Sequence, residues 1–486
     1  MSEAAYTIEI SAGGRPLVDL SGLTLKEGGI TFLLGESGIG KSLAARAIFG
    51  LLDPDEFSVT INGMGYRQYL DEVRPMQRAG FFVFQEPSTH LNPMMTVGEQ
   101  LEEGDLAWGR GAAESLGELW RREAAHDVAV INRLYPQPHR PSGGEKQRVL
   151  LAMALRKMDL APERKHGIFI FDEPTGSLDN PYRDLFVKSL LTRYRRQPRT
   201  ILFITHDYSL LSHLLAEYRD LLKVMNFREI VWSDRRLSVR DFHPGEYVDW
   251  VSSLQKTRVR SGSAEKPLLF LDSSLRILGR ELKITSDAEG REETPLEVMP
   301  GRMVYLKAPS GTGKTSVAKA VMGLLPAERM RATVAGRMLT ESTPRHAWQS
   351  LWGKAMTMVF QHADEALNMN TSVGHTLAQL RVPGVEAALE MLFDAGSVPA
   401  LMRRKVWMLS GGQKQRLNLV RGMMLGTDIL FLDEPLNGLD FESSTRVVAV
   451  IREKLKEGRG VVVISHNEEI FDALVRQEDR YYLRAG

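Results

Sequence analysis

The sequence has no cysteine, no long hydrophobic run and almost no net charge, and each absence excludes a class of protein. Without cysteine, it can hold no disulfide scaffold, no iron–sulfur cluster, no cysteine-ligated zinc and no cysteine nucleophile. The longest apolar strings, IFIF at 168–171 and VVVI at 461–464, are far shorter than the ~18 residues of a membrane span. The first residues, MSEAAYTIEI, lack the basic start and apolar core of a secretion signal. We therefore expect any membrane role to work through other chains.

Charge and composition describe a globular protein of more than one domain. Lys and Arg number 62 and Asp and Glu 61, so the net charge of +1 gives no overall attraction to nucleic acid or anionic lipid. Because 43% of the residues are hydrophobic, the chain can bury substantial cores. At roughly 150 residues per domain, its length predicts two or three domains.

The same series of motifs occurs twice along the chain, in the same order and at nearly constant intervals. Its members are GESGIGKS at 35–42 and APSGTGKT at 308–315, FQ at 84–85 and 360–361, SGGEKQR at 142–148 and SGGQKQR at 410–416, IFIFDEP at 168–174 and ILFLDEP at 429–435, SLD at 177–179 and GLD at 438–440, and ITHD at 204–207 and ISHN at 464–467. Such a repeat indicates two homologous domains.

A polar stretch separates the two repeats. QKTRVRSGSAEK at 255–266 carries Ser and Gly and shows no apolar periodicity, which is typical of a flexible linker. We therefore predict one domain at 1–254 and another at 267–486. In each, a strand-like segment enters a Gly-rich turn followed by a helical pattern, and a continuous apolar run ends in Asp-Glu. Such runs are typical of strands buried on both faces of a parallel sheet, so the pattern predicts an α/β fold.

The Gly-rich turns have the residues of a phosphate-binding loop. The first fits G-x-x-x-x-G-K-[ST], in which backbone amides surround phosphate oxygens, the lysine reaches the terminal phosphates and the hydroxyl coordinates Mg²⁺. The second copy begins with Ala in place of Gly, and Ala resists positive φ, so the start of that loop can be remodelled. An ordinary turn would explain one copy, but it does not explain two aligned copies. The predicted phosphate-binding residues are Gly35, Glu36, Ser37, Gly38, Gly40, Lys41 and Ser42, and Ala308, Ser310, Gly311, Gly313, Lys314 and Thr315.

An acidic pair ends one apolar strand of each repeat. Asp172 and Glu173 end the first, and Asp433 and Glu434 the second. The Asp can hold Mg²⁺ through water, and the Glu, facing the opposite way, can polarise an attacking water. A solvated strand end is the alternative, and the nearby phosphate loops disfavour it.

A histidine follows a second apolar run in each repeat. His206 follows LFIT and His466 follows VVIS. A single histidine is more often a packed or solvated side chain than a functional one. Because this pair stands at matched distances after the acidic residues, we predict that both act near a terminal phosphate.

The remaining repeated motif combines a helix cap with two glycines. Ser with Glu or Gln three positions later is a capping box, whatever the function. The Gly-Gly between them leaves the amides at the helix start open to an anion, which predicts a second phosphate-binding surface in each domain. Its residues are Ser142, Gly143, Gly144 and Glu145, and Ser410, Gly411, Gly412 and Gln413.

Taken together, the six motifs resemble Walker A, Q-loop, signature, Walker B, D-loop and H-loop of the ATP-binding cassette (ABC) superfamily. The resemblance implies an α/β fold of two tandem P-loop NTPase domains, each with a mostly parallel sheet core, an antiparallel β subdomain and a helical subdomain. It also implies an ATPase that uses ATP and Mg²⁺. In that family two cassettes face head to tail and hold each ATP between the Walker A of one and the signature of the other. A tandem chain can form both sites by itself.

The resemblance assigns roles by matching position. The residues that the resemblance makes catalytic are Gln85, Glu173 and His206 in the first repeat and Gln361, Glu434 and His466 in the second. Those that would hold Mg²⁺ are Ser42, Gln85 and Asp172 in the first repeat and Thr315, Gln361 and Asp433 in the second. The residues that would couple the two sites are Asp179 and Asp440. Lys41 would face Ser410, Gly412 and Gln413, and Lys314 would face Ser142, Gly144 and Glu145.

Besides Ala308, further positions depart from the family pattern. Pro141 replaces the customary signature Leu, and Asn437 replaces the usual D-loop Ser, which raises the question of unequal sites. The aromatic residue that often stacks on adenine aligns with Ala12, and the second half has no aromatic residue there. The contact to adenine is therefore open.

One branch of the family fits further segments. FQEPSTHLNPMMTVGEQL at 84–101, and the weaker FQHADEALNMNTSV at 360–373, resemble the Q-loop region of dipeptide, oligopeptide and nickel importer ATPases. DFHPGEYVDWVSSL at 241–254 resembles their tail segment. The resemblance implies an importer subunit for peptides, nickel or a metal–chelator complex, peripheral on the cytoplasmic face of the inner membrane. Its partners would be two permeases, with an external solute-binding protein, and it would need neither nucleic acid nor an obligatory homodimer.

Two other classes remain as alternatives. A soluble twin-cassette factor acting on ribosomes shares the SGGEK signature but usually carries a long basic helical segment between cassettes, which this chain lacks. A DNA-repair ATPase would need zinc modules or long coiled coils, and the sequence has neither cysteine nor extended heptads.

Overall fold

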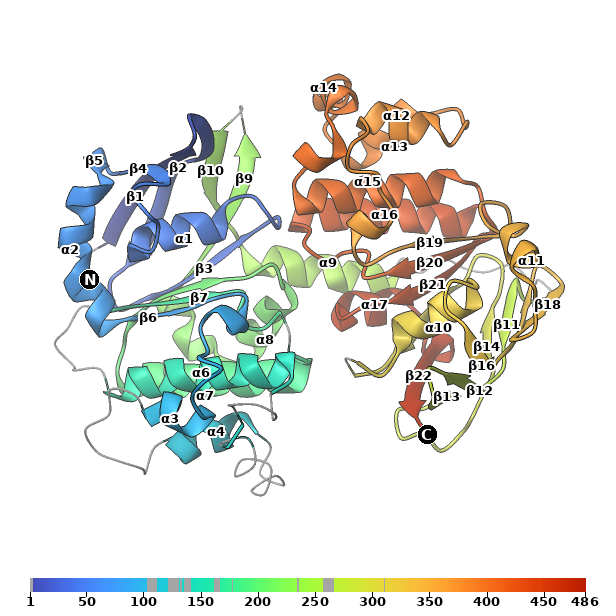
Figure 1. Cartoon of the computed structure of the whole chain (residues 1–486), viewed down its shortest axis with the longest axis horizontal. Coiled ribbons are helices and arrows are strands. Elements are labelled where there is room, and N and C mark those ends of the chain that lie inside the picture. The colour runs from blue at the N-terminus through green and yellow to red at the C-terminus, as the bar shows by residue number, and fades with distance from the viewer. Residues whose placement is uncertain are drawn as a thin grey trace. The chain divides into compact units, whose positions relative to one another are not determined.

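The structure is a computed structural model, which describes residues 3–102, 112–120, 131, 133–134, 141–160, 167–176, 178–233, 236–256, 266–309 and 311–486. It divides into two compact units, Met1–Pro244 and Gly245–Gly486 (Figure 1). Most of the predicted linker, at 257–265, lies outside the described residues, as does Ser310 of the second predicted phosphate loop.

The first unit is built on one large sheet. Its strands are β1 (Glu3–Ala12), β2 (Arg15–Lys26), β3 (Ile30–Gly35), β4 (Phe57–Ile61), β5 (Met64–Gly65), β6 (Phe81–Val83), β7 (Ile168–Asp172), β8 (Thr200–Ile204), β9 (Met225–Ser233) and β10 (Arg236–Asp241). Its helices are α1 (Lys41–Phe49), α2 (Tyr66–Ala79), α3 (Val97–Glu102), α4 (Ala112–Leu119), α6 (Gly143–Leu160), α7 (Asn180–Arg196) and α8 (Ser209–Glu217), with 3₁₀ turns η1 (Pro87–Thr89) and η3 (Arg219–Val224).

The second unit has two sheets. Its strands are β11 (Leu269–Leu271), β12 (Ser274–Ile277), β13 (Arg280–Thr285), β14 (Leu296–Val298), β15 (Met303–Lys307), β16 (Ala327–Arg329), β17 (Arg331–Val334), β18 (Arg337–Thr340), β19 (Met356–Val359), β20 (Ile429–Asp433), β21 (Gly460–Ile464) and β22 (Arg480–Ala485). Its helices are α9 (Pro244–Lys256), α10 (Lys314–Val321), α11 (Arg345–Gln349), α12 (Val373–Ala378), α13 (Val385–Leu392), α14 (Val398–Arg403), α15 (Gly411–Met424), α16 (Phe441–Lys456) and α17 (Glu468–Leu474), with 3₁₀ turns η4 (Ala363–Glu365), η5 (Ala395–Ser397), η6 (Val406–Met408) and η7 (Gln477–Asp479).

Both units share one parallel core. The strand order β3-β8-β7-β6 of the first unit corresponds to β15-β21-β20-β19 of the second, and every neighbouring pair within these cores is parallel. Antiparallel strands extend the first sheet through β1, β2, β4 and β5, whereas in the second unit β14-β11-β17-β18 form a separate antiparallel sheet. The α/β prediction of two tandem domains is confirmed.

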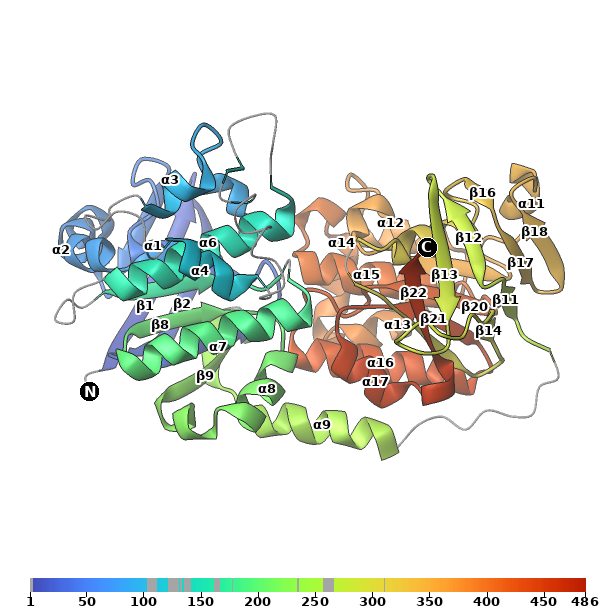
Figure 2. The ribbon, with the colours of Figure 1, turned by 90° about the horizontal axis from the view of Figure 1, so that it is seen from below.

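Both faces of the first parallel core are covered, as the unbroken apolar runs predicted. Alternate residues of a strand point to opposite faces. Leu33 of β3 packs in one cluster with Ala44 and Ile48 of α1. Phe32 of the same strand packs in another with side chains of α6 and α7, which lie side by side in Figure 2.

The arrangement brings the repeated motifs to one edge of each sheet. Gly35 and Asp172 end β3 and β7, and Gln85 and His206 follow β6 and β8. All four strands are parallel neighbours, so their carboxyl ends meet, which is where open α/β sheets bind ligands. The second unit repeats this placement.

Helix α9 belongs to the second unit. Tyr247, Val251 and Leu254 share one face at helical spacing, and all three are buried. The Tyr247 hydroxyl donates to Oε2 of Glu469 at 3.2 Å, and the Trp250 ring meets Phe441 edge-on at 5.5 Å. The boundary between the units therefore precedes the predicted linker. The polar stretch at 255–266 marks the end of the apolar face of α9, whereas the change of packing partners lies before this helix.

Within the described ranges, no helix is long and apolar enough to cross a membrane.

Candidate functional sites

The first phosphate loop joins β3 to α1 with its lysine turned inward. Gly38 and Gly40 have φ of 81° and 111°, which suits glycine and leads the backbone into the helix. Lys41 is 4% exposed, and its Nζ donates to the carbonyl oxygens of Gly35 at 2.8 Å and Glu36 at 2.9 Å. A buried cation is thus held beside the amides of the helix start.

A hydroxyl and a buried carboxylate meet beside this loop. Ser42 Oγ donates to Oδ1 of Asp172 at 2.8 Å, and Asp172 is fully buried. Burial raises the pKa of Asp172 to about 6, against the opposing effect of the Ser42 hydrogen bond. Within the described residues, its other oxygen, Oδ2, is buried without a hydrogen-bond partner. This orphaned oxygen next to a hydroxyl suits a hard cation, which prefers oxygen ligands.

Glu173 lies between the predicted glutamine and histidine. Gln85 Nε2 donates to its Oε2 at 2.8 Å, and Nδ1 of His206 lies 3.1 Å from its Oε1. Burial would raise the pKa of Glu173, but the hydrogen bond and charge of His206 outweigh it, so this pKa lies below its ordinary value. The pKa of His206 is raised: burial opposes this, and Glu173 outweighs it. Each of these two side chains therefore favours the charged form of the other.

The second unit repeats the loop. Gly311 and Gly313 have φ of 77° and 113°, and Lys314, 7% exposed, donates from Nζ to the carbonyl oxygens of Ala308 and Pro309. Thr315 Oγ1 lies 2.9 Å from Oδ2 and 3.1 Å from Oδ1 of buried Asp433. Burial raises the pKa of Asp433.

Glu434 is held differently from Glu173. Ser465 Oγ and the His466 backbone N–H each donate to its Oε2 at 3.0 Å. The His466 ring is farther away, with Nε2 3.4 Å from Oε1, and its side chain is 51% exposed against 23% for His206. Burial raises the pKa of Glu434 despite the charge of His466. Gln361 is half-buried, and no hydrogen bond to Glu434 is found for it in the described part of the chain.

Both predicted bases sit on a strained backbone. Glu173 and Glu434 have φ of 47° and 49°, a left-handed conformation that costs a non-glycine residue roughly 1–3 kcal/mol. In each, the backbone N–H donates to the end of the neighbouring strand, to Ile204 and Ile464. Strain kept at the same position in both units is typical of a functional site.

The start of the loop differs between units, as the Ala308 substitution predicted. Gly35 has φ of 138°, and a Cβ there would stand 2.7 Å from the carbonyl oxygen of Ile230. Ala308 is not among the described residues with positive φ. The following glycines have matching conformations, so the difference is confined to the first position.

Both signature motifs form the predicted capping boxes. Ser142 N–H donates to Oε2 of Glu145 at 2.6 Å, and Glu145 N–H donates back to Ser142 Oγ at 3.4 Å. Ser410 and Gln413 do the same at the start of α15. Gly143 and Gly411 are the first residues of their helices, so the glycines lie where the helix amides are open.

The three residues after each signature were not predicted to have a role, although the sequence repeats KQR in both copies. The glutamines, Gln147 and Gln415, donate to the carbonyl oxygens of Pro174 and Glu434, directly at the acidic pair. The lysines reach the turn after the Q-loop: Lys146 donates to Ser88 and Lys414 to Asp364.

The arginines of these triplets reach the helix after the D-loop. Arg148 lies over the Tyr182 ring at 4.4 Å, and Arg416 donates to the Ser443 hydroxyl. Each triplet thus ties its signature helix to three other motifs of its own unit. Repetition of KQR in the sequence was the signal for a shared role.

The D-loop aspartates begin the next helices. Asp440 Oδ1 accepts from the Ser443 N–H at 2.7 Å at the start of α16, and Asp179 holds the same N-cap position before α7. Each aspartate therefore stands at the start of a helix of its own unit.

The residue after each histidine differs. Asp207 pairs with Arg183 at 2.8 Å, where the second unit has Asn467. Burial would raise the pKa of Asp207, but Arg183 and the Ser209 hydroxyl outweigh it and lower this pKa.

We expect Asp207→Asn to lower the free energy of unfolding of the first unit by about 1–2 kcal/mol at pH 7, because Arg183 loses a largely buried partner but keeps Asp184. Since the folded pKa is lowered, this stabilisation is present above the ordinary value of about 3.9 and is lost as the pH falls through the folded value. Urea unfolding should show the same difference at pH 7 and pH 5 and a smaller one at pH 3.5. A constant difference would mean that charge does not contribute.

Comparison with known proteins decides the family. The profile of the family described as "ABC transporter" matches residues 18–176 and 292–437. This chain belongs to the ABC transporter family. The match covers both phosphate loops and both acidic pairs, so the chain is an ATPase with two ATP-binding cassettes.

Relatives of this ABC chain include two subunits of transporters. It is 25% identical to the glutathione import ATP-binding protein GsiA of Salmonella paratyphi A, over 95% of this chain and 81% of the relative. It is 27% identical to the peptidoglycan transport ATP-binding protein YejF of Agrobacterium fabrum, over 96% and 88%.

Solved structures share the twin-cassette fold. The RNase-L Inhibitor matches with a TM-score of 0.61 at 18% identity, over 98% of this chain and 89% of that one. The archaeal ribosome recycling factor aABCE1, solved in complex with the ribosomal stalk protein aP1, matches at 0.62 and 18%, over 96% and 87%. At such identity the likeness shows the fold alone.

In the first cassette, Gly35→Ala is expected to weaken ATP binding about tenfold, because a Cβ would crowd Ile230 and force the loop out of its φ of 138°. Titration with a fluorescent ATP analogue in a Lys314→Ala background would isolate this cassette. Ala308→Gly, tested for the second cassette in a Lys41→Ala background, is the matched control and should leave binding unchanged. Unaltered affinity in Gly35→Ala would contradict the strain argument.

Proposed function

We propose that this chain is the ATP-hydrolysing subunit of an ABC importer, which couples ATP binding and hydrolysis to transport through partner permeases. The observation that carries the proposal is its alignment, along nearly its whole length, with the importer subunit GsiA. The glutathione named for that relative and the peptidoglycan named for YejF favour a peptide-like substrate over nickel. The chain would then work at the cytoplasmic face of the inner membrane.

Each cassette has a lysine, a hydroxyl and two carboxylates in positions suited to ATP hydrolysis. Lys41 and Lys314 would bind the terminal phosphates, because their buried amines donate to loop carbonyls and can turn to a stronger acceptor. Ser42 with Asp172, and Thr315 with Asp433, would hold Mg²⁺, with Gln85 and Gln361 beside them. Mg²⁺ would neutralise charge on the phosphates.

Glu173 and Glu434 would accept a proton from the attacking water. Each must be ionised for this, and each is aimed by groups on neighbouring strand ends. His206 favours the ionised form of Glu173, and Gln85 holds its other oxygen. In the second cassette, Ser465 and the His466 amide take over the positioning of Glu434.

The signatures would complete each site from the opposite cassette. Ser410, Gly412 and Gln413 would close on the ATP held by Lys41, and Ser142, Gly144 and Glu145 on the ATP held by Lys314. The open helix amides at both signatures suit a phosphate. Asp179 and Asp440, at helix starts beside the acidic pairs, would link the two sites.

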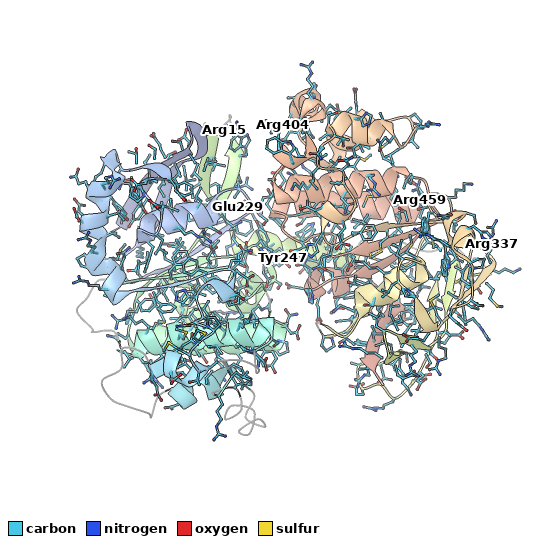
Figure 3. The ribbon with its side chains drawn as sticks, in the orientation of Figure 1. Arg15, Glu229, Tyr247, Arg337, Arg404 and Arg459 are labelled. Atoms are coloured by element: carbon cyan, nitrogen blue, oxygen red, sulfur yellow. The ribbon has the colours of Figure 1, made fainter. Side chains whose placement is uncertain are left out.

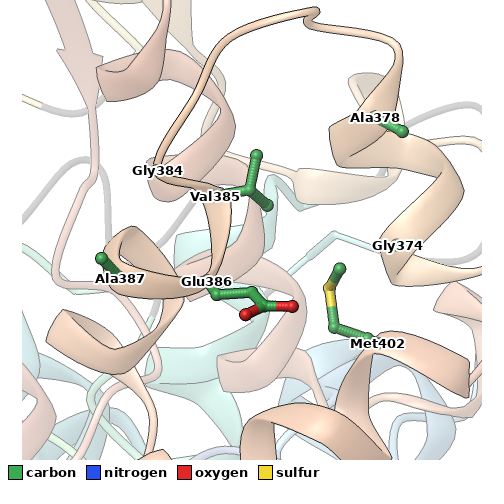
Figure 4. A pocket seen from close by; sticks show the side chains of 7 residues that line it. All are labelled: Gly374, Ala378, Gly384, Val385, Glu386, Ala387 and Met402. Carbon is green, nitrogen blue, oxygen red and sulfur yellow. The ribbon is translucent and has the colours of Figure 1, made fainter.

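A hollow in the second cassette suits a partner segment. It has a volume of about 350 Å³ and lies between α12, α13 and α14, in the region that follows the Q-loop. Figure 4 shows Glu386 and Met402 projecting into it from two sides, while Gly374, Ala378, Gly384 and Ala387 leave room for close approach. We propose that it receives a segment of a permease.

A pull-down from gently solubilised membranes, followed by mass spectrometry, tests the importer role. The tagged chain should bring down two multi-span permeases, and Glu386→Lys should reduce their recovery while leaving the ATPase rate of the purified chain unchanged. Recovery of ribosomal proteins without any permease would overturn the proposal and support a role on ribosomes.

A further inference from the structure

The base of the bound nucleotide has no aromatic partner at the expected position, which is occupied by Ala12. An exposed tryptophan stands on a different strand. Trp232 of β9 is 67% exposed, and single exposed apolar residues are common. The position of Trp232 in the sheet register relates it to the phosphate loop.

Trp232 lies just beyond the start of the phosphate loop. β9 runs parallel to β3, with Ile230 beside Gly35. Trp232 is two residues farther along and therefore points to the same face of the sheet as Ile230. Ile230 packs in one cluster with Ala44 and Ile48 of α1, the helix that the loop begins. Trp232 is thus on the face that carries the loop.

The pairing of β9 with β10 also places Trp232 on the face that carries the phosphate loop. Trp232 is directly opposite Leu237 in the antiparallel pair of β9 and β10, so their side chains share a face. A Cβ on Gly40 would lie 3.7 Å from Cδ1 of Leu237. Leu237, the neighbour of Trp232, therefore lies next to the space above Gly40, the last glycine before Lys41.

Figure 1 shows β9 and β10 continuing past the loop between β3 and α1. In Figure 3, Arg15 marks the start of β2, and Glu229 lies on β9, three residues before Trp232.

We propose that Trp232 stacks on the base of the nucleotide held by the first cassette. With its phosphates in the loop, the nucleotide extends its ribose and base outward, to where an exposed indole can cover the ring. Stacking on an aromatic side chain should raise the affinity for the nucleotide about fivefold to 150-fold. The inference rests on the proposed role of Gly35–Ser42.

The second cassette lacks this contact. Lys307 pairs with Tyr482 in β22, so the next residue, Leu483, stands beside Ala308, and Ala485 takes the place of Trp232. The first cassette should therefore prefer ATP to inorganic tripolyphosphate, which has no base. The second cassette should show a smaller preference.

Binding of ATP and of tripolyphosphate, each with Mg²⁺, tests the inference in a Lys314→Ala background. Trp232→Ala should weaken ATP roughly tenfold and leave tripolyphosphate unchanged, while Trp232→Phe restores most of the ATP affinity. Met338→Ala, equally exposed at 67% but on β18, is the matched control and should alter neither. Equal ATP affinity with and without Trp232 would overturn the stacking role.

Two further measurements distinguish failure of the stacking role of Trp232 from failure of the phosphate-loop assignment. Adding Lys41→Ala should abolish binding of both ligands, and if it alters neither, the loop assignment itself is wrong. ATP should also quench tryptophan emission in the protein but not in Trp232→Phe. This readout needs no alanine variant, and identical quenching in both proteins would overturn the proposal.

Discussion

Replacing Glu173 and Glu434 together with Gln is expected to lower the steady-state ATPase rate by at least about 100-fold, since a positioned general base contributes roughly 10²–10⁴-fold. Gln keeps the size of Glu and can bond to the same neighbours but cannot accept the proton. ATP binding should therefore persist. The rate of phosphate release, measured beside nucleotide affinity, checks both parts. A rate close to wild type would remove both residues from the reaction.

The two single variants test whether the sites are equal. The site built on Lys314 combines two departures from the family pattern, Ala308 and Pro141, and its Glu434 has the more distant histidine. We expect Glu173→Gln, which leaves only this site, to retain a lower single-turnover rate than Glu434→Gln. Equal residual rates would contradict this.

Replacing both phosphate-loop lysines, Lys41 and Lys314, with Ala should weaken ATP binding by about 100-fold or more. Each lysine can make several charge-assisted hydrogen bonds to phosphate, at about 1.5–3 kcal/mol each. Either single variant should halve the number of ATP molecules bound, which equilibrium dialysis would count.

A neighbouring lysine provides the control. Lys307 directly precedes the second loop and is also largely buried, but its Nζ is paired with Glu468 and Asp472, each at 2.9 Å. Lys307→Ala should retain both bound nucleotides at near wild-type affinity. If it lost ATP as Lys314→Ala does, general damage to the loop would explain both results.

Much of the fold could be predicted because the motifs are local and repeated. The apolar runs at 168–171 and 429–432 are buried strands of a parallel sheet, and SGGEK and SGGQK form capping boxes. The change from Gly35 to Ala308 predicted where the loops diverge, because positive φ is a property of a single residue. The tandem domains followed from the order of the motifs.

The contacts between distant segments could not be predicted in this way. The same histidine motif brings a ring nitrogen to 3.1 Å from Glu173 but only to 3.4 Å from Glu434, because this distance depends on how two strand ends meet. The polar linker marked the end of α9 but not the unit to which α9 belongs.

Trp232 is the clearest example of the difference between what the sequence determines and what the tertiary structure decides. Its identity and strand-like surroundings are visible in the sequence, but a strand pattern does not say which strand will be its neighbour. The sequence alone determines local backbone conformation, burial periodicity and the inventory of chemical groups, since each depends on residues close together in the chain. Register and side-chain pairing depend on packing between segments far apart in the chain. Here they bring Gln85, Glu173 and His206 together, and they place Ile230, two residues before Trp232, beside Gly35 of the phosphate loop.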